Sequence, residues 1–567
     1  MSQYQAPLQE MQFHLFDVWQ VDKHWQQVPE LAEMLEAETA QAILQEAAKI
    51  CEQQIAPFSQ LADQQGVSLH DGKVTTPAHY KDAYQAWCEG GWAGFSGDQQ
   101  FGGMGMPKVL SMMLDEMMCS ADIAFSLYPG LTAGGCVTLS QYASEAMKQA
   151  YLPKLYSGEW SATMCLTESH AGSDLGLMRT QAKPQADGSY LISGSKIFIT
   201  AGEHDLTDNI IHLVLAKLPD APAGSRGISL FVVPKFVLTD AGEPGEPNQL
   251  HCGSVEHKMG IHASATCVMN FDDATGFLIG EPHKGLAAMF TMMNYERLAM
   301  GSQGLGAAER AYQNANAYAH ERLQGRVREK DANKAEAIIQ HPDVERMLLT
   351  IKAINEAGRS FSTWVALALD QAKFNQDAQQ LQRASLLTPI AKAFMTDLGL
   401  ECTVQAQQVF GGHGYVKEWG MEQLVRDVRI AQIYEGTNGI QAADFMLRKV
   451  AADQGAALLA LLSEIGQELT ESNNNAILLA YVTRSIKLTE SLLQRGQKDK
   501  ALLASFAYEF MTLIGYVLYG YMWQRQLQAL SASQLSDELR QDKYKTAQFY
   551  FQRVLPRAES LLVIMAE

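Results

Sequence analysis

The sequence predicts an α+β protein that is mostly α-helical. Apolar residues recur at helical spacing on both sides of a central segment, that segment carries short strand-like apolar runs, and a further helical stretch follows at the C-terminal end. At 567 residues the chain is too long for a single hydrophobic core. We therefore expect four parts, at residues 1–160, 161–284, 285–450 and 451–567.

The first part is expected to be an N-terminal helical domain. Residues 31–151 are rich in Ala, Gln, Leu, Met and Glu, and Tyr128-Pro129-Gly130 is predicted to form a turn. The second part is expected to be a central β-domain, because the hairpin signal Asp187-Gly188 is followed by apolar runs such as 197–200. Its segment 239–248, rich in Gly, Pro and acidic residues, predicts a surface loop, and the strands are expected to finish near Gly280.

Helical spacing returns in the third and fourth parts. It is carried by two sets of apolar residues, namely Leu286, Met289, Phe290 and Met293, and then Leu458, Leu461, Leu462 and Ile465. The third part is predicted to be a helical bundle and the fourth an appended helical module. The apolar stretch 510–523 is shorter than the roughly 20 residues that a membrane-spanning helix needs, so it predicts a buried helix.

Charge and cysteine usage exclude several classes of protein. The chain has 44 basic and 63 acidic residues, a net charge of −19, which disfavours nucleic-acid binding. Its eight cysteines are scattered singly, as in a protein whose thiols stay reduced. The N-terminal residues have neither the apolar core of a signal peptide nor the Arg-rich character of a transit peptide. We expect a cytoplasmic protein with no membrane span.

Four segments carry residue types that are suited to chemistry, and they comprise residues 164–174, 196–200, 408–415 and 433–441. The first offers hydroxyls and a glycine near a turn, and the second an alternating strand that ends in Thr200. The third has three glycines in four positions, and the fourth places Glu435 before a Gly-Thr pair that can cap a helix. Taken singly, each also fits a plain structural explanation: a polar loop, a strand, a helix-ending turn, or a solvated glutamate favoured by the helix dipole.

Taken together, in this order, the four segments resemble the acyl-CoA dehydrogenase family over roughly residues 30–450. The segments 294–297 (Asn-Tyr-Glu-Arg) and 320–322 (His-Glu-Arg) add to the resemblance. It implies a helical domain, a β-barrel and a four-helix bundle that bind FAD without a Rossmann domain. The glycine-rich run 301–306 lies inside a helical pattern with no preceding strand, so it does not predict dinucleotide binding.

The resemblance implies a role for individual residues of this chain. Residues that match flavin-binding positions are Met164, Leu166, Thr167, Ser173, Phe198, Thr200, Gly436 and Thr437. Residues that match positions reaching FAD across a dimer interface are Arg322, Gln408 and Gly412. Residues that match substrate-side positions are Ser173, Asn294 and Arg297. Gly439 departs from the family, which usually has Gln there, and this puts that one contact in doubt.

The resemblance also assigns Glu435 as the base that removes the α-proton of an acyl-CoA thioester while a hydride leaves the β-carbon for the flavin. Some family members place their base at the position of Glu296, which remains the alternative. We favour Glu435 because it lies in the complete motif. His251, His257 and His262 are irregularly spaced and lack a completing ligand set, so no metal site is predicted.

The extra residues after Arg322, the long β-domain loop and the C-terminal module resemble a larger bacterial subgroup of the family, which includes enzymes acting on 3-methylthiopropionyl-CoA. The expected role is in fatty acid metabolism and β-oxidation, on that thioester or on a short- or medium-chain acyl-CoA. The expected partners are electron-transfer flavoprotein and a second copy of the chain, as a homodimer or a dimer of dimers. The alternatives are an acyl-CoA oxidase or flavin monooxygenase on the same scaffold, and a non-catalytic CoA-binding scaffold.

Overall fold

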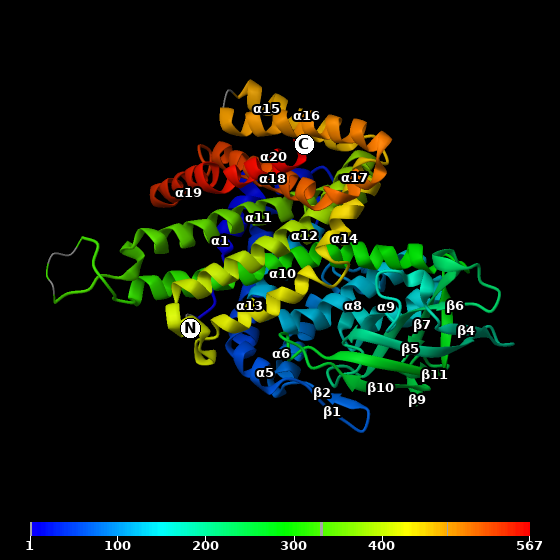
Figure 1. Cartoon of the computed structure of the whole chain (residues 1–567). Coiled ribbons are helices and arrows are strands. Elements are labelled where there is room, and N and C mark those ends of the chain that lie inside the picture. The colour runs from blue at the N-terminus through cyan, green and yellow to red at the C-terminus, as the bar shows by residue number, and fades with distance from the viewer. Residues whose placement is uncertain (1–2, 329–330, 332, 473–474, 567) are drawn as a thin grey trace. The chain divides into compact units, whose positions relative to one another are not determined.

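The computed structural model describes residues 3–328, 331, 333–472 and 475–566. The chain divides into two compact units. The helical unit comprises Met1–Ala48, Lys108–Ser120 and Arg297–Glu567, and the sheet unit comprises Lys49–Pro107 and Ala121–Glu296. Helices precede and follow a sheet-rich middle, and a further helical module ends the chain, so the predicted fold class is confirmed (Figure 1).

The sheet unit is built around a seven-stranded sheet, whose strands are β3 (Trp160–Cys165), β4 (Gln181–Pro184), β5 (Tyr190–Thr200), β6 (Asn209–Lys217), β7 (Ile228–Pro234), β10 (Leu250–Val255) and β11 (Thr266–Ile279). Because β7 pairs with both β11 and β6, the strands β11, β5, β4, β6 and β7 form a closed ring, which is the expected barrel. Strands β6 and β7 are buried almost throughout, which explains their continuous apolar sequences.

Turns in the sheet unit follow the sequence signals in most places. β4 and β5 are antiparallel and Gly188 has a φ of +87°, so the predicted hairpin is confirmed. The last strand ends at Ile279, as expected. The segment 239–248 is not simply a loop, because β9 (Pro244–Pro247) within it pairs with β8 (Phe236–Leu238). A short hairpin also joins β1 (Ser68–His70) to β2 (Lys73–Thr75).

The helices of the sheet unit are α5 (Ser59–Gln65), α6 (Ala78–Glu89), α8 (Ile123–Tyr142) and α9 (Glu145–Ser157) (Figure 1). Helix α8 packs against β3. The predicted turn at 128–130 is wrong, because Pro129 lies inside α8. This helix is capped by Asp122 and almost wholly buried, and burial outweighs the roughly 3 kcal/mol that an internal proline costs. By length and composition α8 could cross a membrane, but 78% of its most apolar window is buried inside the protein.

The helical unit contains a bundle of long helices, α10 (Gly285–Glu321, whose first residues belong to the sheet unit), α11 (Pro342–Phe374) and α12 (Ala378–Val409). Gly301–Gly306 lies inside α10, as expected. Around the bundle lie α1 (Leu8–Gln12), α2 (Val21–Trp25), α3 (Pro29–Ala32), α4 (Ala37–Ile50), α7 (Lys108–Ala121), α13 (Met421–Arg429) and α14 (Asn438–Ala443). Helices α10 and α12 approach closely where Gly399 meets the backbone of Gly304, which leaves no space for a β-carbon at either position.

The C-terminal module consists of α15 (Ala456–Glu471), α16 (Ala476–Lys498), α17 (Lys500–Ser505), α18 (Ala507–Ala529), α19 (Asp537–Phe549) and α20 (Ala558–Ala566). The apolar face predicted for α15 is buried, and the stretch 510–523 lies in α18 with most of its side chains buried. Helices α18 and α19 pack against α11 (Figure 1). The buried amine of Lys543 bonds Glu356 at 2.9 Å and Glu10 at 2.7 Å, so ion pairs join the module to the bundle and to the N-terminal helix.

Candidate active site

Glu435 lies on a short loop between the 3₁₀ turn Ile430–Gln432 and helix α14. Its φ of +55° falls in the left-handed region that side chains other than Gly, Asn and Asp rarely adopt, and such backbone strain is concentrated at functional sites. Two contacts hold this conformation. Gln441 donates from Nε2 to the backbone oxygen of Glu435 at 3.0 Å, and Thr437 caps α14 by accepting from the N–H of Ile440.

The electrostatic surroundings of Glu435 suit a base that works near neutral pH. Burial raises the pKa of Glu435 to about 7, against the opposing charges of Arg297 and Lys392. The side chain keeps some solvent exposure, so the protein desolvates the carboxyl group without enclosing it. Burial likewise lowers the pKa of Arg297, and the charges of Asp444 and Glu435 oppose that change. A carboxyl group with a pKa near 7 can accept a proton and release it again.

Lys392 is a residue near Glu435 that the sequence reasoning missed. It lies in α12 with 0% of its side chain exposed, and its amine donates to Oδ1 of Asn438 at 2.8 Å. Burial lowers the pKa of Lys392 to about 8, although Glu435 and Asp397 favour its charged form. The available signal was a single lysine within the apolar helical run 389–395.

The alternative base, Glu296, has different surroundings. It is 1% exposed, and a β-carbon added at Gly134 of α8 would collide with its Oε1. Glu296 therefore lies tightly packed in the sheet unit, where the glycine makes room for its carboxyl group. Asn294, two residues earlier in α10, is exposed, whereas Arg297 is half-buried.

The flavin-matching residues of the sheet unit gather around one end of β5. Phe198 has a φ of +59° and a side chain 60% exposed, and it lies where the register between β5 and β11 shifts. The alternation that would place Phe198 and Thr200 on one face is therefore interrupted by a bulge. The N–H of Ile197 donates to the oxygen of Thr167 at 2.9 Å, which brings the loop after β3 beside this bulge.

The remaining residues of this group differ in their exposure to solvent. Met164, Thr167 and Thr200 are half-buried, Leu166 is buried, and Ser173 is exposed. Gly172 has open space where a β-carbon would lie, so the backbone there can be approached closely. An exposed flat ring on β5, with Thr200 on the same strand and Thr167 on the loop bonded to that strand, fits a planar, hydrogen-bonding ring system such as a flavin.

A buried ion pair holds the loop that carries these residues, and the sequence reasoning missed this pair as well. The amine of Lys196, 0% exposed, bonds the oxygen of Leu166 at 3.0 Å and Oε1 of Glu168 at 2.9 Å. Glu168 also accepts from the backbone N–H groups of Arg179 and Thr180. Burial opposes the charge of Glu168, but Lys196 and these donors outweigh it and lower its pKa to about 2.

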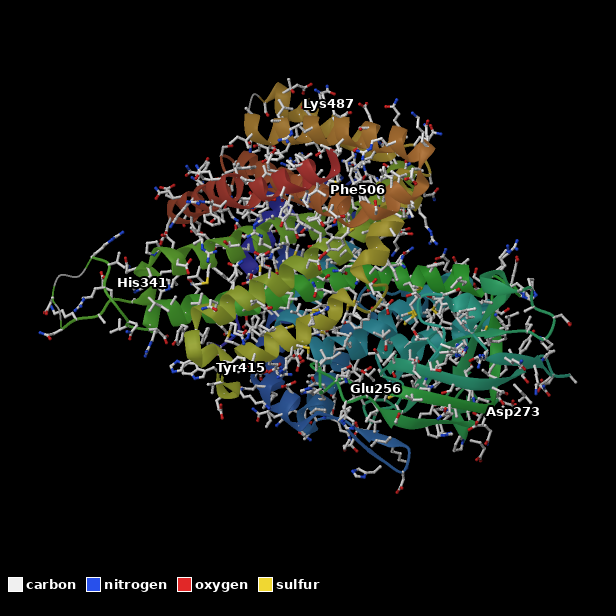
Figure 2. The ribbon with its side chains drawn as sticks, viewed as in Figure 1. Glu256, Asp273, His341, Tyr415, Lys487 and Phe506 are labelled. Carbon is white, nitrogen blue, oxygen red and sulfur yellow. The ribbon has the colours of Figure 1, made fainter. Side chains whose placement is uncertain are left out.

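The three residues that match positions reaching FAD across a dimer are all exposed, and they are Arg322, Gln408 and Gly412. They lie together because Tyr318, one turn before Arg322, stacks on Phe410 with ring centroids 4.1 Å apart. The hydroxyl of Tyr318 also lies 2.9 Å from Nδ1 of His413. Tyr415 lies with His413 in the 3₁₀ turn Gly411–Tyr415, and its side chain is 86% exposed (Figure 2).

This cluster lies far from Glu435 within one chain. The hydroxyl of Tyr434, next to Glu435, donates to Gln303 of α10, whereas the exposed cluster contacts the same helix at Tyr318. Fifteen residues separate Gln303 from Tyr318 in sequence, which is a rise of about 22 Å along an α-helix. Among the residues of the helical unit that match FAD-binding positions, Gly436 and Thr437 therefore lie beside Glu435. The exposed cluster of Arg322, Gln408 and Gly412 lies at the other contact with α10.

The three histidines considered for a metal site are spread over β10 and the turn before β11. His262 lies 2.9 Å from Asp63, and His251 lies 3.3 Å from Asp272. Across the described part of the chain, no three His, Cys, Asp or Glu residues are grouped so that they could hold a metal ion. All eight cysteines are free thiols, as expected.

Comparison with known proteins gives matches along nearly the whole chain. Models of the acyl-CoA dehydrogenase family match its N-terminal domain at residues 37–159, its middle domain at 163–274 and its C-terminal domain at 283–449. A fourth model, described as acetyl-CoA dehydrogenase C-terminal like, matches residues 461–567.

Individual relatives are similar over the same extent. The chain is 42% identical to a 3-methylmercaptopropionyl-CoA dehydrogenase of Ruegeria pomeroyi, over 97% of this chain and 96% of that one. It is 34% identical to a broad-specificity linear acyl-CoA dehydrogenase of Mycobacterium tuberculosis, over 98% and 96%. The solved structure of a Bacillus anthracis acyl-CoA dehydrogenase complexed with FAD has the same fold, with a TM-score of 0.76, 21% identity, and coverage of 95% and 90%. On these matches, this chain belongs to the acyl-CoA dehydrogenase family.

Proposed function

We propose that this protein oxidises an acyl-CoA thioester to the trans-2-enoyl thioester with bound FAD, and that Glu435 is the catalytic base. The observation that carries the proposal is the Glu435 carboxyl group, whose pKa is raised to about 7 on a loop held in a strained conformation. Glu296 packs tightly against Gly134 in the core of the sheet unit, which leaves it less room to meet a substrate.

In this reaction Glu435 takes the proton from the α-carbon of the thioester. The backbone N–H of Glu435 donates to the thioester carbonyl and stabilises the negative charge that develops there. Arg297 and Lys392 keep part of the Glu435 population ionised despite burial, so that the base is available before substrate arrives. FAD, when bound, accepts the hydride that leaves the β-carbon.

The residues proposed to hold FAD fit its chemistry in both units. In the sheet unit they are Met164, Leu166, Thr167, Ser173, Phe198 and Thr200, which offer a flat ring and hydroxyl groups. In the helical unit they are Gly436 and Thr437, beside the base, and the exposed cluster of Arg322, Gln408 and Gly412. On the substrate side we propose Ser173, Asn294 and Arg297.

The exposed cluster supports a homodimer or a dimer of dimers. The cluster contacts α10 at Tyr318, whereas Tyr434, the neighbour of Glu435, contacts it at Gln303. These two points of α10 are about 22 Å apart. We therefore propose that the cluster serves the FAD of a second copy. We also propose that the enzyme works in the cytoplasm, within fatty acid oxidation, and passes its electrons to electron-transfer flavoprotein.

For the substrate we propose 3-methylthiopropionyl-CoA or a linear acyl-CoA of short or medium length. The name of the R. pomeroyi relative supports the first class, that of the M. tuberculosis relative supports a linear acyl chain, and that of a 35% identical butyryl-CoA dehydrogenase of Syntrophomonas wolfei supports a short one. The test is anaerobic addition of a panel of acyl-CoAs to the purified protein, with flavin absorbance as the readout. We expect bleaching by at least one thioester. A colourless protein, or bound flavin that no thioester bleaches, would contradict the proposal, and fast reoxidation by oxygen would indicate an oxidase.

The pKa of Glu435 predicts how flavin reduction depends on pH. Only the ionised carboxylate can accept the α-proton, so the second-order rate constant for flavin reduction should rise with pH and level off above about 7. Below about 6 it should fall nearly tenfold for each pH unit. Anaerobic stopped-flow measurements at low substrate concentration report the free enzyme. A rate that stays flat from pH 5 to 8 would show that no group of this pKa acts as the base.

A further inference from the structure

A chain of hydrogen bonds runs from the C-terminal module to the Glu435 loop within the helical unit. It starts at Tyr508 in α18, two residues after Phe506 (Figure 2). The Tyr508 hydroxyl donates to Oδ2 of Asp397 in α12 at 2.5 Å. Such a bond to a charged acceptor is stronger than one between neutral groups. Although the Tyr508 side chain is 42% exposed, burial and this bond raise the pKa of Tyr508, so its hydroxyl remains a donor.

Asp397 in turn joins the two ends of the Glu435 loop. Its Oδ1 accepts from Nε2 of Gln432 at 2.6 Å and from Nδ2 of Asn438 at 2.7 Å. Gln432 lies three residues before Glu435, and Asn438 lies three residues after it. One carboxylate therefore fixes both ends of the strained segment, while its second oxygen is held by Tyr508.

The same asparagine positions the buried charge of Lys392. Because Nδ2 of Asn438 faces Asp397, its Oδ1 faces the other way and accepts from the Lys392 amine at 2.8 Å. Further bonds from Nδ2 of Asn438 to the oxygen of Ala393 and to Oγ1 of Thr396 fix the amide plane. Besides each other, the charged groups that act on Glu435 and Lys392 are Arg297 and Asp397, and Asp444 and Arg448 act in turn on Arg297.

The module also packs against the helical segment that follows the loop. The ring of Phe510 in α18 stacks on that of Phe445, with centroids 6.0 Å apart, just beyond α14. Tyr508 and Phe510 therefore contact the loop region from the same end of α18. An apolar and a polar contact together restrict the movement of the loop relative to the module.

We propose that Tyr508, through Asp397 and Asn438, is a positioning residue that holds the Glu435 loop and the Lys392 charge beside it. The C-terminal module thereby takes part in preparing the base. This inference rests on the proposed role of Glu435. Tyr508 reaches the loop through Asp397, and Lys392 reaches it through Asn438. Because these residues act on the loop of the base, we expect their effects to appear in the rate of proton removal more than in substrate binding.

The test compares Tyr508→Phe with a matched control on the same helix, Tyr521→Phe. The Tyr521 hydroxyl donates to Oε2 of Glu468 at 2.7 Å, so the control also loses one hydroxyl–carboxylate bond, but one that points into the module. We expect Tyr508→Phe to lower the limiting rate of flavin reduction about three- to tenfold, with little change in the substrate concentration for half-maximal rate. Tyr521→Phe should match the wild type, and both variants should keep similar unfolding temperatures.

Lys392→Met provides a readout that a purely structural role would not change. Removing this positive charge makes Glu435 harder to ionise, so the acid limb of the pH profile should move to higher pH. If Tyr508 acts along the same path, adding Tyr508→Phe to Lys392→Met should change the rate less than it does in the wild type. Additive effects, or equal rates for Tyr508→Phe and Tyr521→Phe, would overturn the inference.

A measurement without turnover separates this inference from the proposed function. The carboxyl band of Glu435, identified by subtracting the infrared spectrum of Glu435→Gln, can be titrated directly in each variant. We expect its midpoint to rise in Lys392→Met, to change in Tyr508→Phe, and to stay unchanged in Tyr521→Phe. A midpoint that is unchanged in the first two variants would overturn the inference even if the wild type oxidises acyl-CoA. Failure of the wild type to reduce its flavin would count against the proposed function alone.

Discussion

Replacing Glu435 with glutamine is expected to abolish flavin reduction by acyl-CoA while leaving the flavin bound. Glutamine has nearly the same shape, but its amide cannot accept the α-proton, and general-base contributions are typically about 10²–10⁴-fold in rate. The bond from Gln441 goes to the backbone oxygen of residue 435, so the loop should keep its conformation. Anaerobic stopped-flow absorbance measures the rate, and the ratio of flavin to protein absorbance measures the bound cofactor.

Glu296→Gln is the matched control for this experiment. It removes the other candidate carboxylate from a closely packed position beside Gly134 and should leave flavin reduction within a small factor of the wild type. The opposite pattern, with reduction surviving in Glu435→Gln and lost in Glu296→Gln, would falsify the assignment of the base. Loss of flavin from Glu435→Gln would instead show that the residue has a structural role.

The proposed base, Glu435, and the rise of its pKa on burial could be expected from the sequence, but the charged residues that surround its loop could not. Glu435 stands in a recognisable motif, followed by a Gly-Thr pair that does cap α14. Lys392 and Asp397 lie far earlier in the chain, and only the packing of α12 beside α14 brings them to the loop. A pKa depends on burial and on charges near in space, and local sequence does not contain either.

The β-domain shows a similar limit. Alternating residues predicted β5 correctly, and Asp187-Gly188 predicted its hairpin. The exposure of Phe198 depends on a bulge against β11, because the register shift between Cys267 and Met269 lies opposite this part of β5. A period of two residues predicts the faces of a regular strand, but a bulge depends on how the partner strand pairs.

Pro129 was misjudged for a related reason. Proline next to glycine is a strong turn signal, and the sequence around it gives no local reason to continue a helix. Tertiary packing decides the outcome, since α8 is buried along most of its length and has a side-chain cap at Asp122. The two buried lysines, one in each unit, by contrast leave a detectable sign in the sequence. Lys196 and Lys392 are single charges at positions where the apolar pattern expects a core residue.

Lys196→Met is expected to have the second largest effect, on stability and on flavin retention together. The substitution fills most of the lysine's volume but leaves Glu168 charged and buried, and breaking a buried ion pair from one side costs about 3–5 kcal/mol. It also removes the bond to the oxygen of Leu166, so the loop that carries Thr167 loses its anchor. We expect a lower unfolding temperature and a lower ratio of flavin to protein after gel filtration.

The double variant Lys196→Met with Glu168→Gln distinguishes the ion pair from simple loss of packing. Glutamine removes the uncompensated charge and can still accept from Arg179 and Thr180, so the double variant should be more stable than Lys196→Met alone. The pH dependence gives an independent check. In the wild type the pKa of Glu168 is lowered to about 2, so its ion pair stabilises the fold above pH 4.5, and this contribution is lost as pH falls from 4.5 toward 2. The difference in unfolding temperature between wild type and Lys196→Met should therefore be largest near neutral pH and shrink in acid. A difference that is independent of pH would mean that Lys196 acts through its methylene chain and not through its charge.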